Sequence, residues 1–371
     1  MKTYILKSVW RFFLVTCGFV AVSCGKNPVN ADIHPGEDVL IPLVFRATDR
    51  PEQTKMTGID HSAESAIGNW AVCVIDNVTG VMKSASSSSA SSISMSLVAG
   101  HSHTVYAAAN YPSGSFDPYS IRTAADFTEK VSYLSENALG RLIMTGSEVF
   151  TPTETVVATD GTYAAQEVNV RVKRLVARID VSGISIDFSE KPHLASRTFV
   201  LKGIYLTNLY RTTRYGNDYF FSDLSDVRSS WYNTGGWHRG ESAEGGIDAM
   251  VGDIDLDTVL DEGTPYTVSH SFYAYANPTA KSDDNHDTDG AWTKRCTRIV
   301  IEVTMDDDPM YYTVDVPAMN RNYIYSLKDV VIRDLGLDDP ESGEKLDDAF
   351  SASFSVFADD WYGPYTVEEN S

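Results

Sequence analysis

The chain is dominated by short apolar runs with the length and composition of β-strands. These runs are rich in β-branched and aromatic residues and are separated by Gly, Asn, Asp and Pro. Such runs lie at residues 38–45, 70–75, 199–206, 298–304 and 311–316. Helical periodicity is scarce, so the pattern predicts an all-β protein.

Two segments depart from this pattern. In residues 124–134 the apolar side chains Phe127, Val131 and Leu134 recur at helical spacing, which predicts a short helix between strands. Residues 84–92 are mostly serine and carry too little apolar surface to fold alone, so we expect a solvated loop there.

One strand pattern occurs twice. Residues 104–112 (TVYAAANYP) resemble residues 271–278 (SFYAYANP), and each stretch follows two similar apolar runs. Alternate alanines let a strand lie close to a facing sheet, and Asn tolerates the turn that ends it. The echo predicts two β-sandwiches of related strand order, with a boundary near residues 161–166. Chance similarity between short strands is the alternative.

The N-terminus has the features of an export signal. Basic residues precede an apolar stretch at 12–22, which is too short to span a bilayer, and small residues lead to Cys24. We expect cleavage before Cys24 and lipidation of its thiol, with ordinary signal-peptide cleavage nearby as the alternative. Residues 24–36 are polar and turn-rich, as a flexible tether would be.

Charge and cysteine content narrow the possible functions. The formal net charge is -21, which repels nucleic acid phosphates and argues against a nucleic-acid partner. Without the signal and the lipidated Cys24, only Cys73 and Cys296 remain. Two cysteines do not make a disulfide framework, so we expect both to be buried as small apolar side chains.

The segment 168–181 (VNVRVKRLVARIDV) alternates apolar and basic residues, which predicts one long strand with a buried face and a cationic face. This Arg-x-x-Ala-Arg-Ile strand, placed after an export signal and a first sandwich, resembles the fimbrillin family of Bacteroidales fimbrial subunits. Residues 142–146 (LIMTG), 320–332 (NRNYIYSLKDVVI) and 354–361 (FSVFADDW) agree with the resemblance in their order along the chain.

The resemblance implies two tandem transthyretin-like (Ig-like) β-sandwich domains behind a lipoprotein signal. The expected organisation is a signal at 1–23, a tether at 24–36, an N-terminal sandwich at 37–165 and a C-terminal sandwich at 166–371. It also implies a lipid-anchored precursor at the outer membrane that joins other fimbrial subunits after a protease removes its first strand. The exposed groove is then filled by a strand from another subunit, which is donor-strand exchange.

The removable strand would be residues 38–45, and the family is cut after an arginine in the following loop. Arg46 precedes the small Ala47, whereas Arg50 precedes proline, a bond that trypsin-like proteases cut poorly. We therefore expect maturation between Arg46 and Ala47, with Arg50 as the alternative. An ordinary surface arginine at a strand end also fits the pattern.

The donor strand would come from the C-terminal region. Phe350, Ala352, Phe354 and Val356 alternate with polar residues, as anchors for a groove would, and Trp361 follows them. The same pattern also suits the last strand of the C-terminal sandwich, filling its own sheet. Whether the subunit belongs to the stalk or the tip stays open.

Motifs for catalysis and cofactor binding are missing from the sequence, so we expect neither an enzyme nor a cofactor. Residues 283–290 resemble a calcium loop but lack its closing acidic residue, and a solvated acidic loop is the alternative. His101 and His103 share one face of a strand without an evident third ligand, so no metal is expected. Loop aromatics at Trp231, Tyr232, Trp237 and Trp292 suit either a glycan-binding face or core packing.

Two functions therefore compete. The first is a structural fimbrial subunit that supports adhesion and biofilm. The second is a monomeric lipoprotein, at the cell surface or a fimbrial tip, that binds a glycan or host ligand. The first predicts arginine-specific cleavage followed by polymer growth, whereas the second predicts ligand binding by the uncut monomer.

Overall fold

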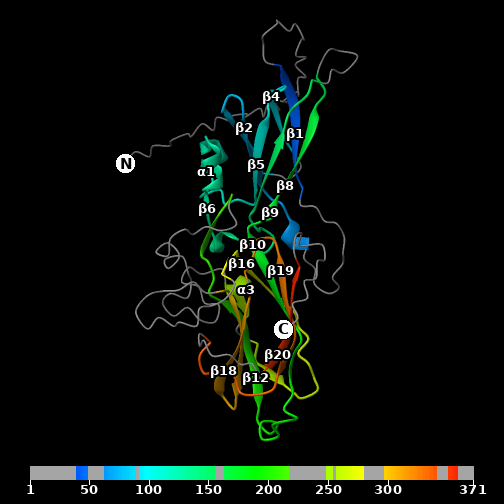
Figure 1. The fold of residues 1–371 in the computed structure, drawn as a ribbon, viewed down its shortest axis with the longest axis vertical. Coiled ribbons are helices and arrows are strands. Elements are labelled where there is room, and N and C mark those ends of the chain that lie inside the picture. The colour runs from blue at the N-terminus through cyan, green and yellow to red at the C-terminus, as the bar shows by residue number, and fades with distance from the viewer. Residues whose placement is uncertain are drawn as a thin grey trace, which may run out of the picture.

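The computed structural model describes residues 39–48, 62–88, 92–154, 163–216, 248–253, 256–279, 296–316, 318–340 and 350–357. These residues form mainly β-strands, which confirms the predicted all-β class (Figure 1). The strands build two sandwiches that follow one another along the long axis of the molecule (Figure 1).

The N-terminal sandwich consists of a three-stranded and a five-stranded sheet. The first has the order β4-β1-β8 and the second the order β3-β2-β5-β7-β9. Apolar side chains from both sheets, including Phe45, Trp70 and Val168, form one core. The strands are β1 (Leu40–Thr48), β2 (Trp70–Asp76), β3 (Met82–Ser87), β4 (Ile93–Val98), β5 (His103–Ala109), β7 (Met144–Phe150), β8 (Gln166–Arg171) and β9 (Lys173–Arg174).

The C-terminal sandwich also consists of two sheets. One has the order β11-β19-β10-β16 with β20 on β19, and the other the order β14-β12-β17-β18 with β15 on β12. The strands are β10 (Val176–Val181), β11 (Ile184–Ile186), β12 (Phe199–Thr207), β14 (Gly252–Asp253), β15 (Thr258–Leu260), β16 (His270–Tyr275), β17 (Arg298–Met305), β18 (Asp308–Asp315), β19 (Ile324–Ile332) and β20 (Phe350–Phe357).

Small elements lie around the junction and at the sandwich margins. A two-stranded sheet pairs β6 (Val131–Tyr133) from the N-terminal half with β13 (Thr212–Arg214) from the C-terminal half. The helices are short: α1 (Ala124–Thr128), α3 (Asp248–Val251) and the 3-10 turns η1 (Ser62–Ser65), η2 (Pro118–Ser120) and η3 (Leu134–Glu136). A second apolar cluster runs from Ala71 and Ala108 of the first sandwich into the core of the second.

The segment expected to open the second sandwich belongs partly to the first. β8 pairs in parallel with β1, and β9 pairs with β7, so residues 166–174 complete the N-terminal sheets. The predicted boundary had assigned these residues to the C-terminal sandwich. The prediction of one long strand over 168–181 is wrong, because the segment divides into β8, β9 and β10 as it passes between sheets.

Two local predictions also need correction. The helix expected over 124–134 ends at Thr128, because residues 131–133 pair with β13 instead. The serine-rich stretch is partly a strand, since β3 pairs with β2 in the register Trp70↔Ser87 to Ile75↔Met82. In both places pairing with another strand outweighs local preference.

No helix among the described residues is long and apolar enough to cross a membrane. Cys73 and Cys296 form no disulfide and are buried, as expected. Burial raises the pKa of the Cys73 thiol to about 11, which keeps it protonated and unreactive at neutral pH.

Candidate functional site: the groove occupied by the first strand

The first strand occupies the middle of its sheet. β1 pairs antiparallel with β4, in the register Leu40↔Val98 to Phe45↔Ile93. On its other side it pairs in parallel with β8, in the register Leu43↔Gln166 to Thr48↔Arg171. Removal of β1 would therefore leave two strands, β4 and β8, with unpaired backbone groups facing an empty slot.

Alternate side chains of β1 fill the core beneath it. Ile41, Leu43 and Phe45 are each at most 1% exposed. The rings of Phe45 and of Phe150 on β7 pack in a T-shaped arrangement, with centroids 5.7 Å apart. Burial of such side chains contributes about 1.5–3 kcal/mol each, so β1 is a principal part of the N-terminal core.

The predicted cleavage site lies at the end of this strand. Arg46 and Ala47 are inside β1 and not in a loop as expected, because the ladder to β8 continues to Thr48. The ladder to β4 ends at Phe45, so this end of β1 is paired on one side only. Arg46 is 46% exposed at its side chain and forms a 3.0 Å ion pair with Glu167 of β8. The alternative, Arg50, lies outside the described residues.

The predicted donor segment lies in the other sandwich. Residues Phe350, Ala352, Phe354 and Val356 belong to β20, which pairs antiparallel with β19. β20 lies in the lower sandwich in Figure 1, whereas β1 lies in the upper one. We call the slot between β4 and β8, which β1 fills, the β1 groove. The fold of a single chain does not bring the donor segment to this groove. Trp361 and the lipidation candidate Cys24 are outside the described residues.

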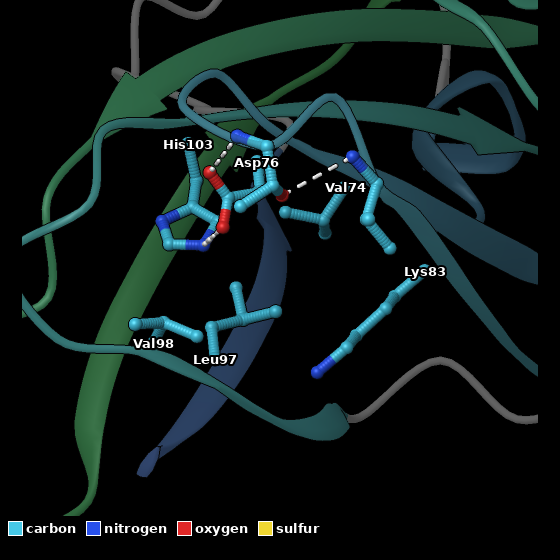
Figure 2. A pocket seen from close by; sticks show the side chains of 8 residues that line it. Val74, Asp76, Lys83, Leu97, Val98 and His103 are labelled. Atoms are coloured by element: carbon cyan, nitrogen blue, oxygen red, sulfur yellow. Dashed lines mark hydrogen bonds and ion pairs between the residues drawn. The ribbon is translucent and has the colours of Figure 1, made fainter. Parts of the chain in front are cut away.

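A pocket of about 200 Å³ lies between the two sheets where β1 begins. Its apolar wall includes Leu97, the partner of Ile41, and Figure 2 shows Asp76 and His103 facing one another above it, with Lys83 opposite. His103 was a candidate from the sequence and Asp76 was not, although residues 76–80 (DNVTG) have a turn composition that could have indicated it.

The carboxylate of Asp76 in this pocket is already bound to neighbouring groups of the protein. The Oδ1 atom of Asp76 accepts hydrogen bonds from the N–H groups of Val78 and Thr79, and its Oδ2 atom lies 2.7 Å from Nδ1 of His101. Burial opposes ionisation of Asp76, but these hydrogen bonds together hold its pKa well below the ordinary value. Among the described residues no group of three or more His, Cys, Asp or Glu side chains is arranged to hold a metal ion.

The acidic stretch 283–290 and the aromatic residues Trp231, Tyr232, Trp237 and Trp292 all lie outside the described residues. The candidate site that the structure does describe is the β1 groove.

Solved structures from Bacteroidales have the same fold. A candidate cell adhesion protein from Parabacteroides distasonis ATCC 8503 matches with a TM-score of 0.58 and 16% identity, over 86% of this chain and 99% of that chain. A fimbrilin from Porphyromonas gingivalis W83 matches with a TM-score of 0.53 and 13% identity, over 85% and 96%. No protein-family model and no curated protein matches the chain. The likeness covers most of both chains and establishes a shared fold.

Proposed function

Because this chain has the fold of a fimbrilin and of candidate cell adhesion proteins, we propose that it is the precursor of a fimbrial subunit. In this proposal the chain is exported as a lipoprotein, anchored through Cys24 to the outer membrane, and matured by removal of β1. Mature subunits then polymerise by donor-strand exchange and support adhesion at the cell surface. The role is structural, and catalysis has no part in it.

The observation that carries the proposal is the position of β1. Removal of a strand at the edge of a sheet exposes the backbone groups of one neighbouring strand. Removal of β1 exposes those of two strands, β4 and β8. An incoming strand regains hydrogen bonds on both sides and can fill the sites of Ile41, Leu43 and Phe45. A precursor that retains β1 has no vacancy, so removal of this strand can control assembly.

The geometry around Arg46 is compatible with regulated cleavage. Proteases require an accessible, locally unfolded segment, and strand ends open more readily than strand centres. Residues 46–48 pair with β8 alone, so opening of this end breaks one ladder only. The exposed ion pair between Arg46 and Glu167 adds at most about 1 kcal/mol to that opening.

The placement of β20 supports its candidacy as the donor. Among the described strands β20 pairs with β19 only, so its release breaks a single ladder. Its sequence, FSASFSVF, alternates apolar and serine residues up to Val356, so its apolar residues have the same two-residue spacing as the three β1 anchors.

The proposal can be tested on the chain from Gly25 onward, treated with a trace of arginine-specific protease. We expect one cut between Arg46 and Ala47, identified by mass spectrometry, and then SDS-resistant ladders. Arg46→Gln should abolish both, whereas Arg50→Gln should change neither. Clean cleavage with a persistent monomer would instead favour the monomeric binding lipoprotein.

A truncated chain tests the donor. A protein that ends at residue 349 keeps the groove but lacks β20, so it should be cut normally and stay monomeric. Mixed with the cut full-length chain, it should accept one donor strand and shorten the ladders. Undiminished polymer growth by the truncated protein alone would exclude β20 as the donor.

A further inference from the structure

A short segment between β1 and β2 is bound to both sandwiches. We call residues 64–68 the junction clasp; they begin in η1 and contact Arg174 and Arg178, which lie where the chain passes from one sandwich to the other. Glu64 is fully buried although it is charged, and nothing in its sequence surroundings indicates this. Such burial is unusual unless the carboxylate is fully paired.

The carboxylate of Glu64 reaches the C-terminal sandwich. Its Oε2 lies 2.8 Å from a guanidinium nitrogen of Arg178 on β10, and its Oε1 accepts a 2.5 Å hydrogen bond from the hydroxyl of Tyr273 on β16. The side chain of Arg174 on β9 donates to the Glu64 carbonyl at 3.1 Å and to the Ser65 hydroxyl at 3.2 Å. Both arginines of the motif at 174–178 therefore hold the clasp.

A further carboxylate lies close to the Glu64–Arg178 pair. Arg178 also pairs with Asp180 at 3.1 Å, and Asp180 accepts a 2.7 Å hydrogen bond from Ser271. Burial and the neighbouring Glu64 raise the pKa of Tyr273, so its hydroxyl stays protonated and donates. Removal of one partner would leave a buried charge incompletely paired.

The other end of the clasp is bound to the N-terminal sandwich through Asn110. The side-chain oxygen of Asn110 accepts a 2.8 Å hydrogen bond from the N–H of Gly68, and its amide donates to the Ala66 carbonyl at 2.7 Å. Asn110 follows β5 with a φ of 55°, a left-handed conformation that Asn tolerates. The same amide donates to the Leu142 carbonyl, which fixes its orientation.

From this geometry we infer that the junction clasp fixes the two sandwiches to each other and does so independently of β1. Its partners lie in β9, β10, β16 and the end of β5, and all of them lie C-terminal to β1 in the chain. Loss of β1 therefore leaves every one of these contacts in place. Glu64 is the positioning residue of this device.

Hydrogen exchange measured by mass spectrometry on the chain from Gly25 tests this inference. In Glu64→Gln, peptides covering residues 62–70 should exchange at least about tenfold faster than in the wild type, because a buried pair is broken. Peptides from the centres of β2 and β17 should be unaffected. Glu148→Gln, at an exposed position of β7, is the matched control and should leave exchange unchanged. Tyr273→Phe removes one hydroxyl and provides a milder variant, with a smaller increase, if Glu64→Gln does not fold.

The same measurement on wild-type protein cut by arginine-specific protease tests independence from β1. Exchange of residues 62–70 should stay within about twofold of the uncut value. A faster exchange rate after cutting would mean that β1 holds the segment. An unchanged rate in Glu64→Gln would mean that Glu64 does not anchor it. Either result overturns the inference. The variant comparison in uncut protein does not depend on cleavage or polymerisation, so it stands or falls separately from the proposed function.

Discussion

At the scale of single residues, Gly146 shows how closely the strands of the N-terminal sandwich approach one another. Gly146 lies in β7, where the backbone of residue 171 passes directly over it. A β-carbon at this position would lie 1.9 Å from the Arg171 carbonyl oxygen and 2.8 Å from its carbon. Backbone atoms cannot move aside as a flexible side chain can, so only glycine fits here.

We therefore expect Gly146→Ala to lower the free energy of unfolding by about 2–3 kcal/mol, the upper range for overpacking. Urea denaturation followed by tryptophan fluorescence measures this change. Gly114→Ala is the control, because a β-carbon there meets no atom within 4 Å and should be nearly neutral. Equal stability of the two variants would contradict the close approach.

The buried His103 makes stability depend on pH. Its side chain is 1% exposed and stacks on Phe150, with ring centroids 5.7 Å apart. Burial lowers the pKa of His103 below 6.5, and this effect outweighs the opposing effects of a hydrogen bond to the His101 carbonyl and of the Asp76 charge. Lys83 adds a smaller repulsion in the same direction as burial.

The unfolded chain therefore binds a proton at this histidine more readily than the folded chain. Stability should be greatest above pH 6.5 and fall as the pH decreases from 6.5 toward the lowered pKa of folded His103. His103→Gln should weaken this dependence between pH 5 and 8 in urea titrations. His193→Gln, at an exposed position, should retain it; a similar pH dependence in both variants would exclude His103 as the cause.

At the scale of elements, β1 illustrates how register assigns different roles to adjacent residues. Side chains of a strand alternate between its two faces, so Leu43 and Phe45 are buried while Val44 between them is only half-buried. Polymerisation by strand exchange would place a donor in the same register, and the buried positions would then determine how tightly it binds.

Phe45→Ala should destabilise the uncut chain by about 3–5 kcal/mol, because it removes a large buried side chain beside Phe150. Val44→Ala, one residue away on the other face, should cost less than about 1 kcal/mol. Thermal or urea unfolding of both variants makes the comparison. A similar loss in both would mean that the face assignment of β1 is wrong.

At the scale of the whole molecule, the two sandwiches share a continuous apolar core. The larger cluster contains Ala108 and Phe127 from the first half together with Ile179 and Tyr325 from the second. Tyr275 of β16 extends this link, since its buried hydroxyl lies 2.9 Å from Ser132 and 3.0 Å from the amide of Asn137. Such contacts couple the unfolding of one sandwich to that of the other.

We expect a single cooperative transition in differential scanning calorimetry of the uncut chain, although its length would permit two. Tyr275→Phe should lower the midpoint of that transition without dividing it, because it removes a hydroxyl shared by both halves. Tyr133→Phe, at a position 44% exposed, should have little effect. Two separate transitions in the wild type would show that the halves unfold independently.

Local patterns along the chain were sufficient to predict its strand class and several of its elements. Short apolar runs rich in β-branched and aromatic residues identified β1, β2, β12, β17 and β18, because such residues favour strands regardless of which strand lies beside them. The repeated Ala-rich stretches correctly marked β5 and β16. The resemblance to fimbrillins, and with it the expected fold, also followed from the order of short motifs.

Tertiary structure alone decided which strands pair and which charges are buried. Residues 168–181 read as one strand with a cationic face, yet Arg174 and Arg178 are buried at the junction, 1% and 3% exposed, around Glu64. Strand pairing also decided three other features. It placed β1 between β4 and β8, it ended the expected helix early, and it put Arg46 within a strand. Each depends on contacts between residues up to about two hundred positions apart, and local propensity carries no information about such partners.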